Sequence, residues 1–196
     1  VPLLADAAAF AISIGDLDLA RASLERCPSG PPDVAVVIAR ARLFLLEGAR
    51  QRAIDVLEAA TADHPEHPAI LHELATTHAD GGDEQIALRR LKNLHALGVE
   101  MPGATALQAR LLRRLGEPEA ALEAIENARS RTTSSTLALE TLFTLRQLGE
   151  VDRARRLWTE WAASTIVDLR WRIQEPSRWL GPIPPWPTRA EGSARD

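Results

Sequence analysis

Apolar and polar residues alternate along this chain with the spacing of amphipathic helices. In five segments an alanine is followed four residues later by a large apolar residue and three residues after that by another apolar residue, which places all three on one helix face. The large residues are Leu24, Leu57, Leu91, Ile125 and Trp158. The pattern predicts an all-α chain whose helices each bury one face.

The same pattern returns at a nearly constant interval. Five glycines are separated by 33, 34, 34 and 33 residues, and each of them precedes an alanine by five residues. The glycines are Gly15, Gly48, Gly82, Gly116 and Gly149. Seven residues before the first four glycines stands an alanine, and a small residue there allows two helices to approach closely. A period of this length indicates stacked helical hairpins.

These residues resemble the tetratricopeptide repeat (TPR), a helix-turn-helix unit with a small residue in its first helix, glycine in its turn, alanine and a bulky residue in its second helix, and a closing proline. Pro32 and Pro65 supply that proline in the first two units, whereas Val99, Thr133 and Ile166 replace it later. The resemblance implies a right-handed α-solenoid of antiparallel helix hairpins, a TPR-like superhelix with a concave groove. The repeats would span residues 1–33, 34–67, 68–101, 102–134 and 135–166, together 1–166.

Local signals place the helices within this period. We expect helix pairs at 3–14/17–27, 34–47/50–63, 68–80/84–97, 103–115/118–130 and 135–148/151–163. Pro68 and Pro102 suit a first helical turn, where the missing N–H is tolerated. Asp16, Asp33 and Asp83 precede second or first helices and are expected to cap them.

The C-terminal end differs in composition, because all five tryptophans lie after residue 157. We expect a further helix near residues 165–174, and we assign residues 167–196 to this capping helix and an extended Trp/Pro-rich tail. The cap would cover the last apolar stripe. The alternative is self-association through this Trp-rich end.

Net charge limits the classes of partner that we expect, and cysteine content indicates the compartment. The formal net charge of -4 gives no overall basic field for nucleic acid or an anionic membrane, so we expect neither as a partner. Cys27 is the only cysteine, which suits a reducing compartment, and we expect a cytoplasmic protein. Lys92 is the only lysine among 23 basic residues, and this arginine bias is typical of GC-rich bacteria.

Catalytic and cofactor motifs are missing from the sequence. His64, His67 and His72 have loose spacing around a turn, which is atypical of zinc sites, so no metal or cofactor is expected. His78 is expected in the core. No phosphate-binding glycine loop or nucleophile motif occurs, and we therefore expect no enzyme activity.

The resemblance implies that residues of the first helices line the concave groove. On this basis the candidate peptide-binding residues are Arg42, His72, Arg110, Arg113, Arg114, Phe143 and Arg146. Guanidinium groups bind carboxylates with two parallel hydrogen bonds, so the arginines suit an acidic or carboxylate-bearing segment. The alternative is that they pair with acidic residues of adjacent turns: Glu117, Glu119 or Glu140.

The sequence thus predicts a non-catalytic scaffold or adaptor that binds a protein or peptide in its concave groove. The alternative is the repeat segment of a larger enzyme or regulator, where it positions substrate or mediates oligomerisation.

Overall fold

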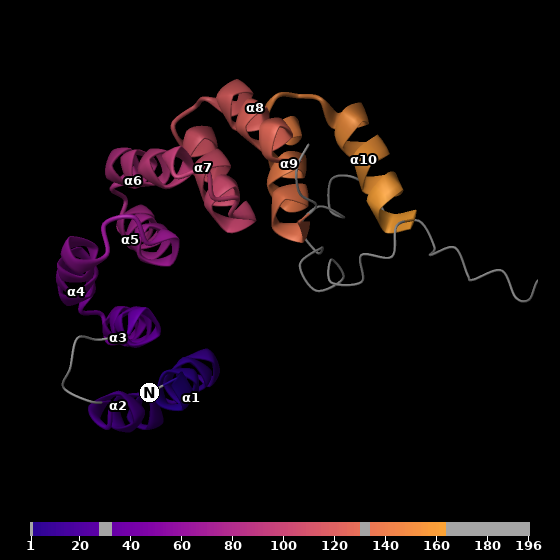
Figure 1. Cartoon of the computed structure of the whole chain (residues 1–196). Helices are drawn as coiled ribbons and strands as arrows, with labels where there is room; N and C mark the ends of the chain where they lie inside the picture. The colour runs from indigo at the N-terminus through magenta and orange to yellow at the C-terminus, as the bar shows by residue number, and fades with distance from the viewer. Residues whose placement is uncertain (1, 28–32, 130–133, 164–196) are drawn as a thin grey trace, which may run out of the picture. The chain divides into compact units, whose positions relative to one another are not determined.

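A computed structural model of the chain describes residues 2–27, 33–129 and 134–163, and within these ranges all regular structure is α-helical (Figure 1). The helices are α1 Pro2–Ile14, α2 Leu17–Glu25, α3 Val34–Leu46, α4 Arg50–Asp63, α5 Pro68–Asp80, α6 Glu84–Ala96, α7 Pro102–Arg114, α8 Pro118–Arg129, α9 Ser135–Gln147 and α10 Val151–Ala163. The predicted all-α class is confirmed, and the expected helices are present within a few residues of their predicted ends.

Consecutive helices pack as the hairpins α1–α2, α3–α4, α5–α6, α7–α8 and α9–α10. The repeating glycines lie in the turns of these hairpins. Their φ angles lie between +76° and +85°, in the left-handed region that side chains with a Cβ rarely adopt. The turn geometry therefore explains why glycine marks the period.

The helices divide between two compact units, Val1–Glu100 with α1 to α6 and Met101–Asp196 with α7 to α10. In the first unit the hairpins stack in chain order, and α7, α8 and α9 pack together in the second. The division into five repeats stays a prediction. The expected capping helix and the Trp/Pro-rich tail lie outside the described residues.

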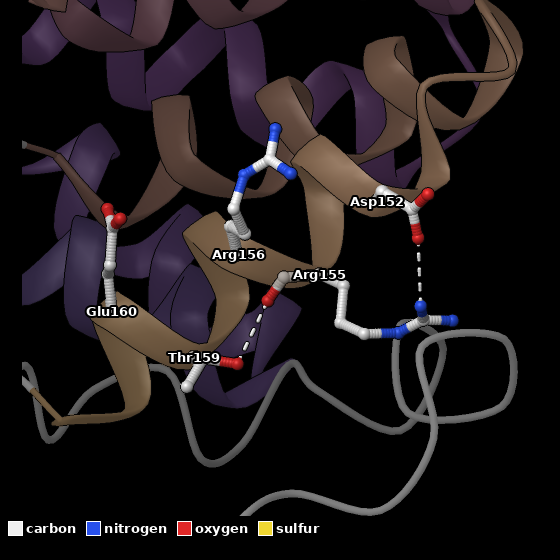
Figure 2. Close-up of a pocket in the computed structure, with 5 residues that line it drawn as sticks. All are labelled: Asp152, Arg155, Arg156, Thr159 and Glu160. Carbon is white, nitrogen blue, oxygen red and sulfur yellow. Dashed lines mark hydrogen bonds and ion pairs between the residues drawn. The ribbon is translucent and has the colours of Figure 1, made fainter.

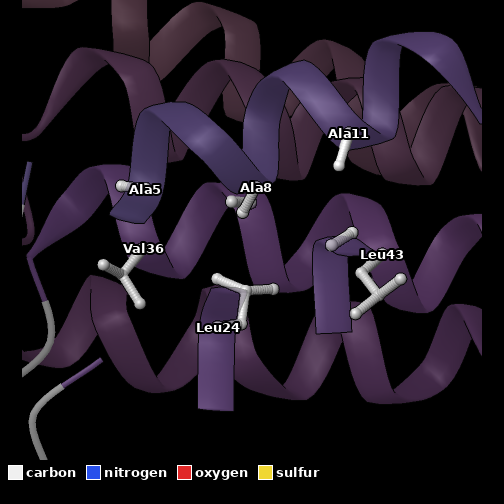
Figure 3. Packing of buried hydrophobic residues seen from close by; sticks show 8 residues of the cluster. Ala5, Ala8, Ala11, Leu24, Val36 and Leu43 are labelled. Carbon is white, nitrogen blue, oxygen red and sulfur yellow. The ribbon is translucent and has the colours of Figure 1, made fainter. Parts of the chain in front are cut away.

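Small residues make the contact between the first hairpin and α3 (Figure 3). Ala8 and Ala11 of α1 are fully buried in one cluster with Leu24 of α2 and with Val36 and Leu43 of α3. Because the alanine side chain has no heavy atom beyond Cβ, the helix axes can lie close together. The alanine seven residues before each of the first four turn glycines is therefore a packing residue.

Larger side chains fill the other interfaces. Leu57 of α4 is fully buried with Ile70 and Leu74 of α5, and in the second unit Leu142 packs with Trp158 of α10. The predicted core position of Trp158 is confirmed. No helix in the described ranges has both the length and the apolar composition that a bilayer crossing requires.

Helix caps agree with the sequence at two of three aspartates. Asp16 accepts a hydrogen bond from the Leu19 amide at 2.9 Å, and Asp33 accepts one from the Ala35 amide at 3.1 Å. The prediction for Asp83 is wrong, because its side chain makes no cap hydrogen bond. Its carboxylate instead pairs with Arg50, a charged donor that is a stronger partner than a backbone amide.

Candidate functional site

An ion pair joins the first helices of two neighbouring hairpins in the N-terminal unit. Arg42 on α3 donates from Nε and Nη2 to the two carboxylate oxygens of Glu73 on α5, at 2.8 Å each. Glu73 is buried, whereas the Arg42 side chain is 51% exposed. Hydrogen bonding to Glu73 raises the pKa of Arg42 above its ordinary value. The guanidinium is thus held in one orientation with its outer edge toward solvent.

In the C-terminal unit one buried carboxylate holds two arginines. Arg110 on α7 donates from Nε and Nη2 to Glu140 Oε1 on α9 at 3.0 and 2.9 Å, and Arg113 Nη2 donates to Glu140 Oε2 at 2.6 Å. The Arg110 side chain is 52% exposed, while Arg113 is largely covered. Two cations share one anion, so this group of three residues has a net charge of about +1.

An aromatic ring and an amide complete the surroundings of Arg113. Its guanidinium carbon lies 5.5 Å from the centroid of the Phe143 ring, within the range of a cation–π contact. Gln147 Nε2 donates to the Arg113 carbonyl oxygen at 3.1 Å. We call Arg110, Arg113, Glu140 and Phe143 the Glu140 cluster. It combines positive charge, exposed N–H donors and an aromatic face on two adjacent helices.

The two ion pairs occupy the same positions of the repeat. Arg42 and Arg110 lie six residues before a turn glycine, and Glu73 and Glu140 lie nine residues before the next one. Four residues beyond each glutamate, a buried threonine hydroxyl donates to the glutamate carbonyl oxygen, at 2.8 Å for Thr77 and 2.7 Å for Thr144. The glutamates were not among the predicted site residues, although aligning the repeats on their glycines would have revealed this shared pattern.

The predicted site residues fall into separate groups in the structure. Arg42 and His72 belong to the N-terminal unit, on α3 and α5. Arg110, Arg113, Arg114, Phe143 and Arg146 belong to the C-terminal unit, and the structure brings Arg110, Arg113 and Phe143 together around Glu140. His72, Arg114 and Arg146 also have partners. The alternative of pairing with adjacent acids therefore holds for Arg110 and Arg113, through Glu140. Their role in binding stays a prediction.

A third polar group fixes the turn between α5 and α6. Arg50 donates from Nε to the Thr77 carbonyl at 3.2 Å and pairs through Nη2 with Asp83, while His78 Nδ1 lies 3.4 Å from the same carboxylate. The hydrogen bond from Arg50, and secondarily that from His78, lowers the pKa of Asp83. His78 is buried as predicted, but its Nε2 has no partner within the described residues.

A pocket of about 690 Å³ lies beside α10 (Figure 2). The residues that line it are Asp152, Arg155, Arg156, Thr159 and Glu160. Arg155 Nη1 lies 3.0 Å from Asp152 Oδ1, and Thr159 donates to the Arg155 carbonyl at 3.0 Å. These are exposed charges of both signs on one helix. They lack the convergent, partly buried arrangement of the Glu140 cluster, which we therefore take as the candidate site.

Metal-ligating side chains do not gather in the described part of the chain, where no three His, Cys, Asp or Glu residues are placed to hold an ion. The geometry of the described residues thus offers hydrogen bonds, charge and apolar contact.

Comparison with known proteins gives a likeness in structure. No family model matches the sequence, and no curated protein matches it. A TPR protein of Parabacteroides merdae is 19% identical with a TM-score of 0.69, over 91% of this chain and 71% of that one. TTC0263, a thermophilic TPR protein of Thermus thermophilus, is 18% identical with a TM-score of 0.70, over 87% and 95%. PilF of Pseudomonas aeruginosa is 18% identical with a TM-score of 0.70, over 80% and 72%. At these identities the likeness shows the fold, a TPR-like α-solenoid.

Proposed function

We propose that this chain, which has the fold of TPR proteins, is a non-catalytic scaffold that binds a protein or peptide. Repeat folds of this kind present extended surfaces built from one helix of each hairpin, and such surfaces suit extended partners. The Glu140 cluster supplies charge, donors and an aromatic ring on that kind of surface, without an arrangement of nucleophile and base.

The ligand that the Glu140 cluster fits best is an acidic or carboxylate-bearing segment. The observation that carries this proposal is the half-exposed guanidinium of Arg110, which Glu140 orients while the cluster keeps a net charge of about +1. A guanidinium has five N–H donors, and Arg110 uses those of Nε and Nη2 toward Glu140. The Nη1 donors remain available to a ligand carboxylate, and their orientation is already fixed before binding.

Neighbouring residues extend this surface. Arg114 follows Arg110 by four residues on α7, and Arg146 follows Phe143 by three on α9, so each lies on the same helix face as its neighbour. Both side chains are exposed. The Phe143 ring, which Arg113 partly covers, provides apolar contact beside the charges. An acidic residue next to an apolar one would therefore match the cluster better than a uniformly acidic stretch.

Binding of labelled peptides to the full chain tests the proposal. The probe is an eight-residue peptide of alternating Glu and Leu with a free C-terminus, followed by fluorescence anisotropy, and an amidated copy separates side-chain from terminal carboxylates. We expect Arg110→Ala with Arg114→Ala to weaken binding about tenfold or more, because charge-assisted hydrogen bonds are lost. The matched control, Arg155→Ala with Arg156→Ala on α10, removes the same charge elsewhere and should bind like the unchanged chain.

Two results would contradict the proposal. Equal weakening in both double variants would mean that only net charge attracts the peptide. Unchanged affinity in the Arg110/Arg114 variant, with helix content retained by circular dichroism, would show that the Glu140 cluster takes no part.

A further inference from the structure

The outward face of α1 carries large apolar side chains in solvent. Leu3 is 81% exposed and Phe10 is 62% exposed. They lie twelve and five residues before the turn glycine Gly15, and the residues at those positions in α3, Val36 and Leu43, are only 2% and 4% exposed. The corresponding residues of α5 and α9 are fully buried: Ile70, Thr77, Leu137 and Thr144. The face that later first helices bury is therefore open on α1.

The covering of α3 shows what kind of element such a face receives. Val36 and Leu43 pack in one cluster with Ala8 and Ala11 of α1 and with Leu24 of α2, which together form the preceding hairpin (Figure 3). A face with apolar residues at these two positions thus fits a helical hairpin that presents small side chains from its first helix and a leucine from its second.

Asp6 adds a negative charge to the open face, at a position of the repeat where other hairpins carry a paired glutamate. It lies nine residues before Gly15, which is the position that Glu73 and Glu140 occupy before their own turn glycines. Each of those glutamates receives an arginine from the first helix of the preceding hairpin. Asp6 is exposed, and in the described residues it forms no ion pair. It is also the one charged residue in α1.

We propose that the outward face of α1 docks a helical hairpin, which packs as a preceding member of the stack and pairs an arginine with Asp6. The exposed apolar residues of α1 occupy the repeat positions through which α3 packs against its own preceding hairpin, and the acidic Asp6 requires a basic residue on the docked hairpin. The proposal is independent of the Glu140 cluster, which lies in the other unit.

A second copy of the chain fits this face less well. Its last described hairpin, α9–α10, has Phe143 at the position where Arg42 and Arg110 stand in their hairpins. Leu139 and Trp158 of that hairpin are buried in the second unit. A copy docked through α9–α10 would therefore bring no arginine to Asp6.

The probe for this face is a synthetic hairpin with the sequence of residues 34–67, which supplies Arg42 to Glu73 in the intact chain. It is labelled and titrated against the full chain. We expect saturable binding that Leu3→Ser with Phe10→Ser abolishes. Leu19→Ser with Leu46→Ser removes two other exposed leucines and serves as the matched control, with binding retained. All four positions are exposed, so these variants should fold normally.

Charge reversal identifies the ion pair. Asp6→Arg should weaken binding about fivefold or more. A probe that carries Arg42→Glu should restore binding to the Asp6→Arg variant, and it should not improve binding to the unchanged chain. Because an isolated hairpin can be poorly folded, the same sequence is also fused ahead of Val1. Residue 67 of the added hairpin can then be joined directly to Val1. Val1 takes the place of Pro68, which follows residue 67 in the natural sequence, because both residues lie fourteen positions before a turn glycine. The fusion should raise the Tm by several degrees, and Asp6→Arg should reduce that gain.

The proposal is overturned if the probe neither binds nor stabilises the fused chain, or if Leu3→Ser with Phe10→Ser leaves both effects intact. It is equally overturned if sedimentation shows a dimer that dissociates in the Phe10→Ser variant, because a second copy would then cover the face.

Discussion

The carboxylate of Glu73 is buried beneath the guanidinium of Arg42, which reaches it from the neighbouring hairpin with two hydrogen bonds of 2.8 Å. The two halves of this pair differ in their access to water. Without Arg42 a buried carboxylate stays unpaired, whereas without the Glu73 charge the half-exposed arginine can be hydrated. We expect Arg42→Met to lower the free energy of unfolding by about 2–3 kcal/mol and Glu73→Gln by about 1 kcal/mol, measured in urea.

The Glu140 cluster provides the internal comparison for that prediction. Glu140 retains Arg113 when Arg110 is replaced, so its carboxylate stays paired. Arg110→Met should therefore cost only about 1 kcal/mol. Equal losses for Arg42→Met and Arg110→Met would contradict the assignment of the difference to an unpaired buried carboxylate.

The Arg50 side chain passes directly over Gly81, in the space that a Cβ at this position would occupy. Gly81 has a φ of -86°, which alanine adopts without strain, so the substitution acts on Arg50 alone. We expect Gly81→Ala to displace the guanidinium from the Thr77 carbonyl and from Asp83, with a loss of about 1–2 kcal/mol. In an Arg50→Ala background the same substitution should cost almost nothing. A loss that persists there would mean that the clash lies elsewhere.

The lowered pKa of Asp83 predicts a stability change in acid. The folded pKa lies below the ordinary value of 3.8, chiefly because of the hydrogen bond from Arg50, so protons bind the unfolded chain first as the pH falls. The contribution of Asp83 is thus complete above the unfolded value and disappears as the pH falls through the folded pKa. Asp83→Asn should lower the Tm at neutral pH, and the gap between variant and unchanged chain should narrow in thermal scans below pH 3.8. A gap that stays constant across that range would contradict this account.

Two adjacent alanines of α1 separate packing from helix propensity. Ala8 is fully buried against the next hairpin, whereas Ala9 is exposed. Ala8→Leu should overfill the interface and cost about 1–3 kcal/mol, while Ala9→Leu should change stability by less than about 0.5 kcal/mol. Chemical denaturation of both variants provides the measurement. Similar effects of the two substitutions would mean that the cluster around α3 accommodates extra volume.

The fold could be predicted from the sequence because its strongest signals are local. Gly48 marks a turn that requires positive φ, and Ala41 marks the tight approach of two helices, so the period follows from backbone geometry and side-chain size. The ends of the helices could be predicted from the same turn glycines. Asp83 shows where local reasoning fails, since a capping position says nothing about a competing arginine 33 residues away.

The candidate site was predicted only in part for a similar reason. The resemblance to TPR units implied that Arg110 and Arg113 line the groove, but their orientation depends on Glu140, which comes from the next hairpin. Which acid an arginine reaches depends on the stagger of two helices and on side-chain rotamers, and neither is encoded in the period. Glu73, a buried acid that pairs with Arg42 from the preceding hairpin, was not predicted at all.

Two different kinds of interface within the first unit give its hairpins a fixed order. Between α1 and α3 the contact is made by alanines and aliphatic side chains, whereas between α3 and α5 it includes the pair of Arg42 and Glu73. If the first two hairpins exchanged places, Ala9 would stand opposite Glu73, and a buried carboxylate would lose its cation. Although built to one pattern, the hairpins are therefore not interchangeable parts: each accepts only a particular neighbour, and shuffled versions of this chain should assemble poorly.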